Sequence, residues 1–212
     1  MRTFIKNFIL LLALLGMTAY FFSDVDNVRH DSSNLRAVND HDIVIGEYFF
    51  TDEATFNHTA QLLFTDLKIT NIIKQAFGIV TPIRIALLSS GGYLYLYERL
   101  AGNRILKDAY IVCTVATAES VAFTFMIDFC DERIMLPNAK VLTHKAYALD
   151  IFGRKIFTDS NMRATIAHSD MEAEVLGIDK GEWFKISRMN GDKYYSREEL
   201  EKYKIATKFI ED

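Results

Sequence analysis

The sequence predicts an α/β fold built around a largely parallel sheet, and three observations lead to this prediction. Short apolar runs typical of buried strands alternate with segments whose apolar residues recur at helical spacing. Turn-forming residues follow the strands, most clearly at Gly91-Gly92. The separation between successive strands leaves room for a helix in each connection, as right-handed crossovers between parallel strands require.

The first half of the folded region shows this alternation most regularly. Apolar groups at helical spacing, together with capping residues at 51–53, predict the first helix, and each later strand likewise runs through a turn into a helical segment. The predicted strands here are Ile43–Ile45, Ile83–Leu88 and Tyr110–Val115, and the predicted helices are Ala54–Leu67, Tyr93–Leu100 and Val121–Asp131.

The second half is predicted to contain two short strands, two helices and a closing segment. Pro137-Asn138 separates the two strands, and Ser196 with Glu198 and Glu199 in the first turn predicts a capped helix. The predicted strands are Arg133–Leu136 and Lys140–His144, the predicted helices are Asn161–Val175 and a segment from Ser196 to about Tyr203, and Ile205–Ile210 closes the domain.

Composition excludes several classes of function. The 212 residues carry a net charge of −4, and the lysines and arginines are scattered, so nucleic acid is not an expected partner. Cys113 and Cys130 lie in apolar runs, where we expect free thiols in the core and no disulfide. Neither cysteine has a second cysteine or a histidine at ligand spacing, so no metal or other cofactor is predicted.

The N-terminus carries a membrane signal. Arg2 and Lys6 precede an uncharged, mostly apolar run from Asn7 to Ser23, which is typical of a signal anchor or a cleaved signal peptide. We expect an uncleaved anchor, because Met17 stands where a cleavage site prefers a small residue. The predicted organisation is an anchor at 1–23, a polar linker at 24–41 and a folded domain at 42–212, with that domain on the non-cytoplasmic side of a membrane.

Three side chains could together supply the chemistry of a serine hydrolase. Ser120 stands where a strand gives way to a helix, His144 follows a strand, and Asp192 follows Asn190-Gly191. A serine hydroxyl needs a base to take its proton and a carboxylate to orient that base. Each residue also has a structural alternative: a helix cap for the serine, a hydrogen-bonded structural residue for the histidine, and a turn residue for the aspartate.

Four stretches, taken together, resemble one family, the proteolytic subunit of the Clp protease (ClpP), from about Asp42 to Ile210. The spacings between the three candidate residues are also similar to those of the family. The matching stretches are Leu88-Ser89-Ser90-Gly91-Gly92, Ala116-Thr117-Ala118-Glu119-Ser120-Val121, Leu136-Pro137-Asn138-Ala139-Lys140-Val141-Leu142-Thr143-His144, and Asp192-Lys193-Tyr194-Tyr195-Ser196.

The resemblance implies a ClpP/crotonase-like fold of repeated β-β-α units with a helical handle insertion. It also implies hydrolysis of peptides or unfolded proteins, assembly into rings, and an ATP-driven unfoldase as partner, to which an exported chain would lose access. By the resemblance, Ser120 is the nucleophile, His144 the general base and Asp192 the group that orients it. The amides of Gly92 and Val121 would form the oxyanion hole. Substrate would lie along a strand edge at Gly91, Tyr93 and Leu94.

Other functions remain open from the sequence. Ser90 replaces the proline of the family motif, and Glu119 puts a carboxylate beside the nucleophile, which suggests a ClpP-like scaffold that assembles without cutting. A membrane-bound serine–lysine peptidase of the signal-peptide-peptidase type would use Lys145 as its base. A crotonase-like acyl-CoA enzyme would use the amides of the glycine pair but would not need the three side chains.

Overall fold

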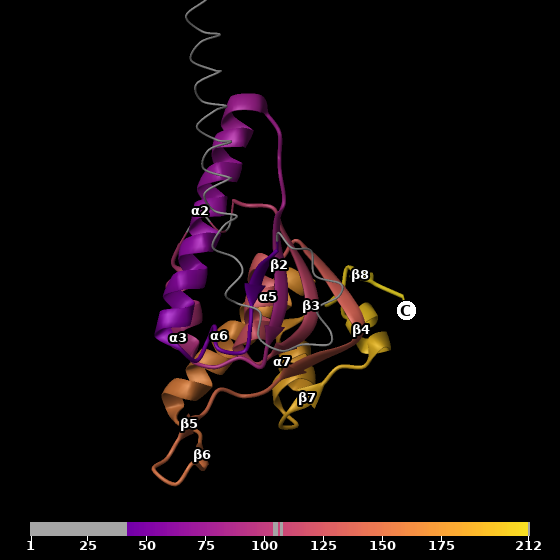
Figure 1. The fold of residues 1–212 in the computed structure, drawn as a ribbon. Coiled ribbons are helices and arrows are strands. Elements are labelled where there is room, and N and C mark those ends of the chain that lie inside the picture. Colours follow the sequence, from indigo (N-terminus) through magenta and orange to yellow (C-terminus); the bar gives the residue numbers. More distant parts are fainter. Residues whose placement is uncertain (1–41, 104–105, 107, 212) are drawn as a thin grey trace, which may run out of the picture. The chain divides into compact units, whose positions relative to one another are not determined.

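The computed structural model describes residues 42–211, apart from 104, 105 and 107 (Figure 1). The predicted anchor at 1–23 and the predicted linker at 24–41 lie outside these residues. Among the described residues, no helix combines the length and the apolar composition needed to span a bilayer.

The described chain folds around a six-stranded sheet in the order β1-β2-β3-β4-β7, with β8 also paired to β4. The pairs from β1 to β4 are parallel, β8 is parallel to β4, and only β7 runs antiparallel. The predicted, largely parallel sheet is therefore confirmed. The strands are β1 (Ile43–Ile45), β2 (Ile83–Ser89), β3 (Ile111–Glu119), β4 (Glu132–Thr143), β7 (Lys193–Tyr194) and β8 (Lys208–Phe209).

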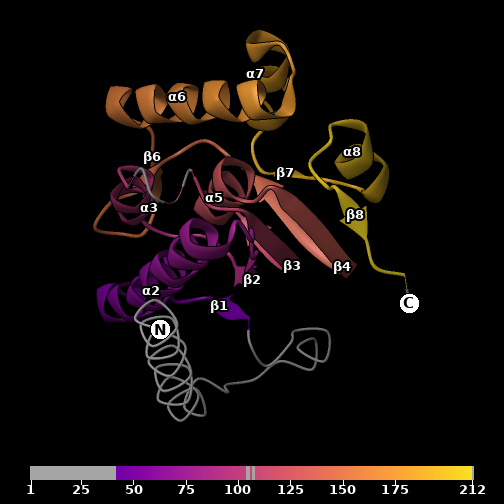
Figure 2. The same ribbon diagram turned by 90° about the horizontal axis from the view of Figure 1, so that it is seen from above.

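Helices fill the connections between these strands. Helix α5 packs on β3 and β4, and α6 packs on α5, so that α6 forms a further layer beyond α5 (Figure 2). The helices are α2 (Glu53–Phe77), α3 (Leu94–Ala101), α5 (Val121–Phe129), α6 (Asp159–Leu176), α7 (Lys180–Arg188) and α8 (Arg197–Lys202).

The first helix is longer than the sequence pattern predicts. Asp52 caps α2 by accepting a hydrogen bond from the amide of Thr55 at 2.7 Å, and the helix ends at Gly78, whose φ is 69°. The prediction ended the helix at Leu67, which is the last buried residue of α2. Beyond Leu67 the helix has no buried face, so its sequence lacks the regular spacing of apolar residues that predicts a helix.

The two strands predicted around Pro137-Asn138 belong to a single strand, β4. Its pairing with β3 jumps from Val115–Met135 to Thr117–Lys140, and Asn138 has a positive φ of 63° within the jump. Four residues of β4 therefore stand opposite one residue of β3. The proline is accommodated because this stretch makes no ladder hydrogen bonds with β3.

The sequence did not predict helix α7 or the small hairpin of β5 (Ala148–Leu149) and β6 (Lys155–Ile156). Both strands of the hairpin are two residues long and exposed, which leaves no alternating pattern to detect. Helix α7 is short, but it contributes the fully buried Trp183 to the core.

Aromatic stacking joins α5, α7 and the C-terminal region. The ring of Phe123 stacks on Trp183 and on Tyr195, with ring centroids 6.3 and 5.8 Å apart. All three side chains are buried. This stack belongs to one continuous apolar core that includes both sheet and helices.

The prediction of free cysteines is wrong, because Cys113 and Cys130 form a disulfide. Cys113 lies in β3, Cys130 directly follows α5, and their Cα atoms are 5.8 Å apart. Apolar surroundings predict burial of each thiol, and both are buried. The apolar sequence around each cysteine does not reveal that β3 and the end of α5 lie side by side, because that depends on how α5 packs against β3.

Candidate active site

Ser120 occupies a sharp turn between β3 and α5. Its backbone has φ 56° and ψ −120°, and its amide donates to the carbonyl of Leu142 at 2.9 Å. The predicted position at the start of a helix is confirmed. Its side chain makes no capping hydrogen bond. A non-glycine residue held at positive φ costs about 1–3 kcal/mol, and such strain is concentrated at functional sites. The geometry resembles the strained turns that expose nucleophilic serines.

The glycine pair lies directly against this turn. Gly91 has φ 94°, and a Cβ built on it would lie 2.7 Å from the Cβ of Ser120 and 3.1 Å from the amide nitrogen of Val121. Gly92 has φ 147°, and a Cβ there would lie 2.2 Å from the carbonyl oxygen of Phe50. Only glycine fits at either position, so the end of β2 reaches the serine without an intervening side chain.

Among the backbone amides of this region, two next to Ser120 and Gly91 lack an acceptor within the described part of the chain. These are the amides of Gly92 and Val121, one from the glycine pair and one from the first residue of α5. Amides at the start of a helix have no acceptor within the helix and favour negative charge. Together the two amides have the chemistry that an oxyanion hole requires.

His144 follows the last residue of β4 and is half-buried. Its Nδ1 lies 2.7 Å from the carbonyl oxygen of Lys145. Because a carbonyl only accepts hydrogen bonds, Nδ1 carries the proton and Nε2 is left as an acceptor, which is the tautomer that a general base needs. Lys145, the alternative base, thus contacts the histidine through its backbone carbonyl, which accepts the hydrogen bond from Nδ1.

The pKa of His144 lies below its ordinary value, and burial is the main cause. The bond to the Lys145 carbonyl and the charge of Asp192 act in the opposite direction, while Lys155 and Arg188 lower the pKa further. The imidazole is therefore neutral at neutral pH and can accept a proton.

Asp192 follows Gly191, a turn residue with φ 81°, and its side chain is about half exposed. Its carboxylate influences His144 electrostatically, so the fold brings the two residues near each other. The carboxylate of Asp192 nevertheless pairs with Lys155, whose Nζ lies 3.5 Å from Oδ1. Within the described residues, no hydrogen bond joins Asp192 to His144 or His144 to Ser120.

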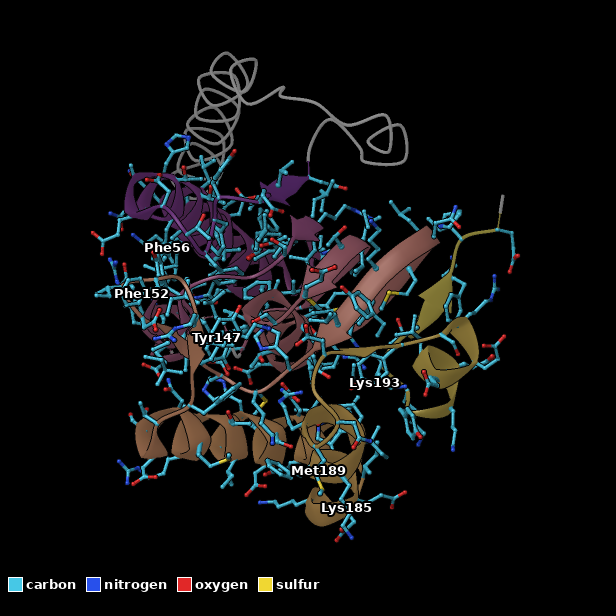
Figure 3. The ribbon with its side chains drawn as sticks, turned by 90° about the horizontal axis from the view of Figure 1, so that it is seen from below. Phe56, Tyr147, Phe152, Lys185, Met189 and Lys193 are labelled. Atoms are coloured by element: carbon cyan, nitrogen blue, oxygen red, sulfur yellow. A yellow bond between two sulfur atoms is a disulfide. The ribbon has the colours of Figure 1, made fainter. Side chains whose placement is uncertain are left out.

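Sequence analysis missed two residues near the histidine, Lys155 on the hairpin and Tyr147 directly before it. Lys155, on β6, places its Nζ 4.6 Å from the ring centroid of Tyr147, and that ring lies 5.1 Å from the imidazole of His144. Tyr147 lies on the segment that leads from β4 to the hairpin, and Phe152 lies in the turn between β5 and β6 (Figure 3). No sequence motif could have found them, because their roles follow from the folding of the hairpin back toward Asp192.

Glu119, the last residue of β3, is partly buried beside the nucleophile. Burial raises the pKa of its carboxyl above the ordinary value, Lys140 lowers it, and the nearby carboxylates of Glu47 and Asp192 raise it further.

Glu47 was not singled out by sequence analysis. It binds Ser90, whose amide donates to Glu47 Oε2 at 3.3 Å and whose hydroxyl hydrogen-bonds to Oε1. Glu47 therefore holds Ser90, the residue directly before the glycine pair, by two hydrogen bonds.

The strand edge predicted at residues 93 and 94 is absent from this conformation. The amide of Tyr93 donates to the carbonyl of Phe50 at 2.6 Å, and Leu94 begins helix α3. Tyr93 is exposed, so its ring remains available at the surface. Gly91 and Gly92, not the two residues that follow them, are left to meet a ligand with their main chain.

No group of three or more metal-binding side chains is found among residues 42–103, 106 and 108–211. The candidate site brings together a strained serine, a neutral histidine and backbone amides, with carboxylates around them. These are the groups of nucleophilic catalysis.

Comparison with known proteins supports the fold. No protein-family profile matches the sequence, and no curated protein matches it. A solved structure of a ClpP1 mutant from Listeria monocytogenes superposes with a TM-score of 0.59 at 19% identity, covering 81% of this chain and 92% of that one. The chain therefore has a ClpP-like fold. At this identity the likeness concerns the fold alone.

Proposed function

We propose that this protein is a ClpP-like serine peptidase that hydrolyses peptides or unfolded proteins. Ser120 would attack the peptide carbonyl, His144 would accept the serine proton and later protonate the leaving amine, and Asp192 would stabilise the imidazolium. The amides of Gly92 and Val121 would bind the oxyanion. The observation that carries the proposal is the positive φ of Ser120 with Gly91 packed directly against it.

The histidine geometry supports the same function. The carbonyl of Lys145 holds the tautomer whose Nε2 is free to act as base, and burial keeps the ring neutral. To complete the triad, the carboxylate of Asp192 would leave its ion pair with Lys155 and form a hydrogen bond with His144. Since the Lys155–Asp192 pair is exposed on both sides, this exchange costs little.

We further propose that the domain works outside the cytoplasm, held to a membrane by residues 1–23, or exported after their cleavage, and that it forms homo-oligomeric rings. The disulfide between Cys113 and Cys130 supports the first proposal, because disulfides persist in oxidising compartments. The ClpP-like fold supports the second. Sedimentation of the purified chain tests ring assembly.

The competing function is a scaffold that assembles without cutting. It is favoured by the contacts of His144 with Lys145 and of Asp192 with Lys155, which leave the three side chains unconnected by hydrogen bonds.

The test is covalent labelling of the full chain in detergent with a fluorophosphonate, read by intact mass. One adduct is expected, absent in Ser120→Ala and in His144→Ala but retained in Lys145→Ala. An adduct lost in Ser120→Ala and in Lys145→Ala but retained in His144→Ala would instead identify a serine–lysine peptidase. A folded and assembled sample without any adduct would favour the scaffold.

A further inference from the structure

A buried carboxylate, that of Glu172, joins three helices around the candidate site. Glu172 lies on α6 and is fully buried. Its Oε1 accepts from the hydroxyl of Thr124 on α5 at 2.9 Å, and its Oε2 accepts from the indole nitrogen of Trp183 on α7 at 3.0 Å. Arg188, the last residue of α7, donates to both oxygens, at 2.7 and 2.9 Å.

The same network continues to the strand that carries the histidine. Arg188 also contacts the carbonyl of Ser187 at 3.3 Å, and that carbonyl accepts from the hydroxyl of Thr143 at 2.8 Å. Thr143 is the last residue of β4 and directly precedes His144. Thr124, at the other end of the network, lies one helical turn after Ser120.

The network thus reaches the elements that adjoin Ser120 and His144, and it includes the end of the helix that precedes Asp192. Helix α5 begins immediately after Ser120, β4 ends immediately before His144, and Asp192 lies four residues beyond Arg188. Helix α6 contributes no residue to the candidate site itself. Among the described residues, however, its Glu172 is the only side chain that hydrogen-bonds to both α5 and α7.

Stability alone gives a weak reason for this arrangement. Removing a carboxylate and a guanidinium from water is costly, and well-packed apolar residues often replace a buried ion pair without loss of stability. A network with every donor paired does, however, hold its members in one geometry, because each bond is directional. Both carboxylate oxygens of Glu172 are held in this way, because each accepts from two donors.

We propose that Glu172 is a positioning residue that sets the spacing between Ser120 and His144. The proposal rests on the proposed function, since it assigns Glu172 a role in the reaction of those two residues. Glu172 acts through Thr124 on one side and through Arg188, Ser187 and Thr143 on the other. It touches neither the nucleophile nor the base.

The test variant is Glu172→Gln in the full chain. Glutamine has nearly the same shape, but its NH₂ group faces the donors of Trp183, Thr124 or Arg188, so at least one of their bonds is lost. The readout is fluorophosphonate labelling of Ser120 over a range of probe concentrations, which separates probe affinity from the limiting acylation rate. We expect the limiting rate to fall at least tenfold with unchanged affinity, because displacement of a reacting group by about 1 Å can cost about a hundredfold.

The matched control is Leu63→Ala, a cavity-forming change in α2 at a residue that is 1% exposed. It destabilises the core without touching the network. Both variants are compared under conditions where each is fully folded, and Leu63→Ala is expected to label at the rate of the natural chain. If the limiting rates of the two variants fall together, in step with their stability, Glu172 is structural and the proposal is overturned.

Amide hydrogen exchange supplies a readout that needs no activity. In Glu172→Gln we expect faster exchange in two separate segments, 121–129 and 141–147, with exchange in 83–89 unchanged. Faster exchange confined to α6 and α7 would overturn the proposal. If the natural chain forms no adduct, the proposed function has failed, and the exchange result still decides whether Glu172 couples the two elements.

Discussion

Gly91 lies against Ser120 so closely that a Cβ on the glycine would stand 2.7 Å from the Cβ of the serine. This contact links the end of β2 to the strained turn after β3. It explains why the turn can persist: the backbone of Ser120 is confined between Gly91 on one side and the carbonyl of Leu142, which accepts its amide hydrogen, on the other.

Gly91→Ala should both destabilise the fold and abolish labelling of Ser120. The added methyl meets the backbone of Glu119 and the side chain of Ser120 at a φ that alanine rarely adopts, so we expect a loss of about 2–4 kcal/mol. The matched control is Gly78→Ala, which has φ 69° but open space around it and should lose only about 1 kcal/mol. Urea denaturation measures both, and equal losses would mean that the close contact has no energetic effect.

Replacing Glu119 should accelerate acylation. Its partly buried carboxylate lies beside the nucleophile, where a negative charge opposes the developing oxyanion, so Glu119→Gln should label about threefold to tenfold faster. The advantage should shrink on acidification, because the natural carboxyl, with its raised pKa, becomes neutral as the pH falls through that value. Labelling rates across pH check this, and a slower variant would assign Glu119 a supporting role.

The pH profile of acylation should report the depressed pKa of His144. Only the neutral imidazole can accept the serine proton, so the rate should rise with pH and reach half of its maximum below about pH 6.5, the ordinary histidine value. Lys155→Ala should move this midpoint upward, because it removes a cation that lowers the pKa and frees Asp192, which raises it.

Arg154→Ala is the matched control for the Lys155 variant. Arg154 lies next to Lys155 on the hairpin, but its ion pair is with Asp150, at 2.7 Å. Its removal should leave the midpoint where it is. A midpoint that moves equally in both variants would show that the hairpin as a whole, and not the charge of Lys155, acts on the histidine.

Loss of the disulfide should cost about 3 kcal/mol of unfolding free energy. The bond closes a loop across 17 residues of sequence, and the chain-entropy model gives about this value for such a loop. Unfolding by urea, with and without a reductant, measures the difference. Cys113→Ala combined with Cys130→Ala should be weakened to a similar degree and should no longer respond to the reductant. If the reductant does not change the unfolding free energy of the natural chain, the prediction is contradicted.

Local sequence signals predicted a large part of the fold. The alternation of strand and helix, the largely parallel sheet and the capped helix at Ser196 were all predicted, because each depends on neighbouring residues. In the structure Ser196 and Glu199 form a capping box at the start of α8, as the local spacing indicates. The place of Ser120 at a strand-to-helix turn was predicted for the same reason.

Patterns failed where an element has no buried face of its own. The second half of α2 and the two strands of the hairpin are largely exposed, so nothing in their residues repeats with a period that marks structure. The candidate site was likewise predicted only in part. The residue types of Ser120, His144 and Asp192 could be read from motifs, whereas their partners, Lys145 and Lys155, could not.

The sequence by itself determined which segments become strands and helices and where a nucleophilic serine could stand, because those properties depend on residues a few positions apart. Only the tertiary structure decided that Cys113 joins Cys130, that Lys155 pairs with Asp192 and that Glu172 binds Thr124, Trp183 and Arg188. Each of these contacts joins side chains 11 to 48 positions apart. They exist because packing of the helices on the sheet brings such positions together, which no local pattern encodes.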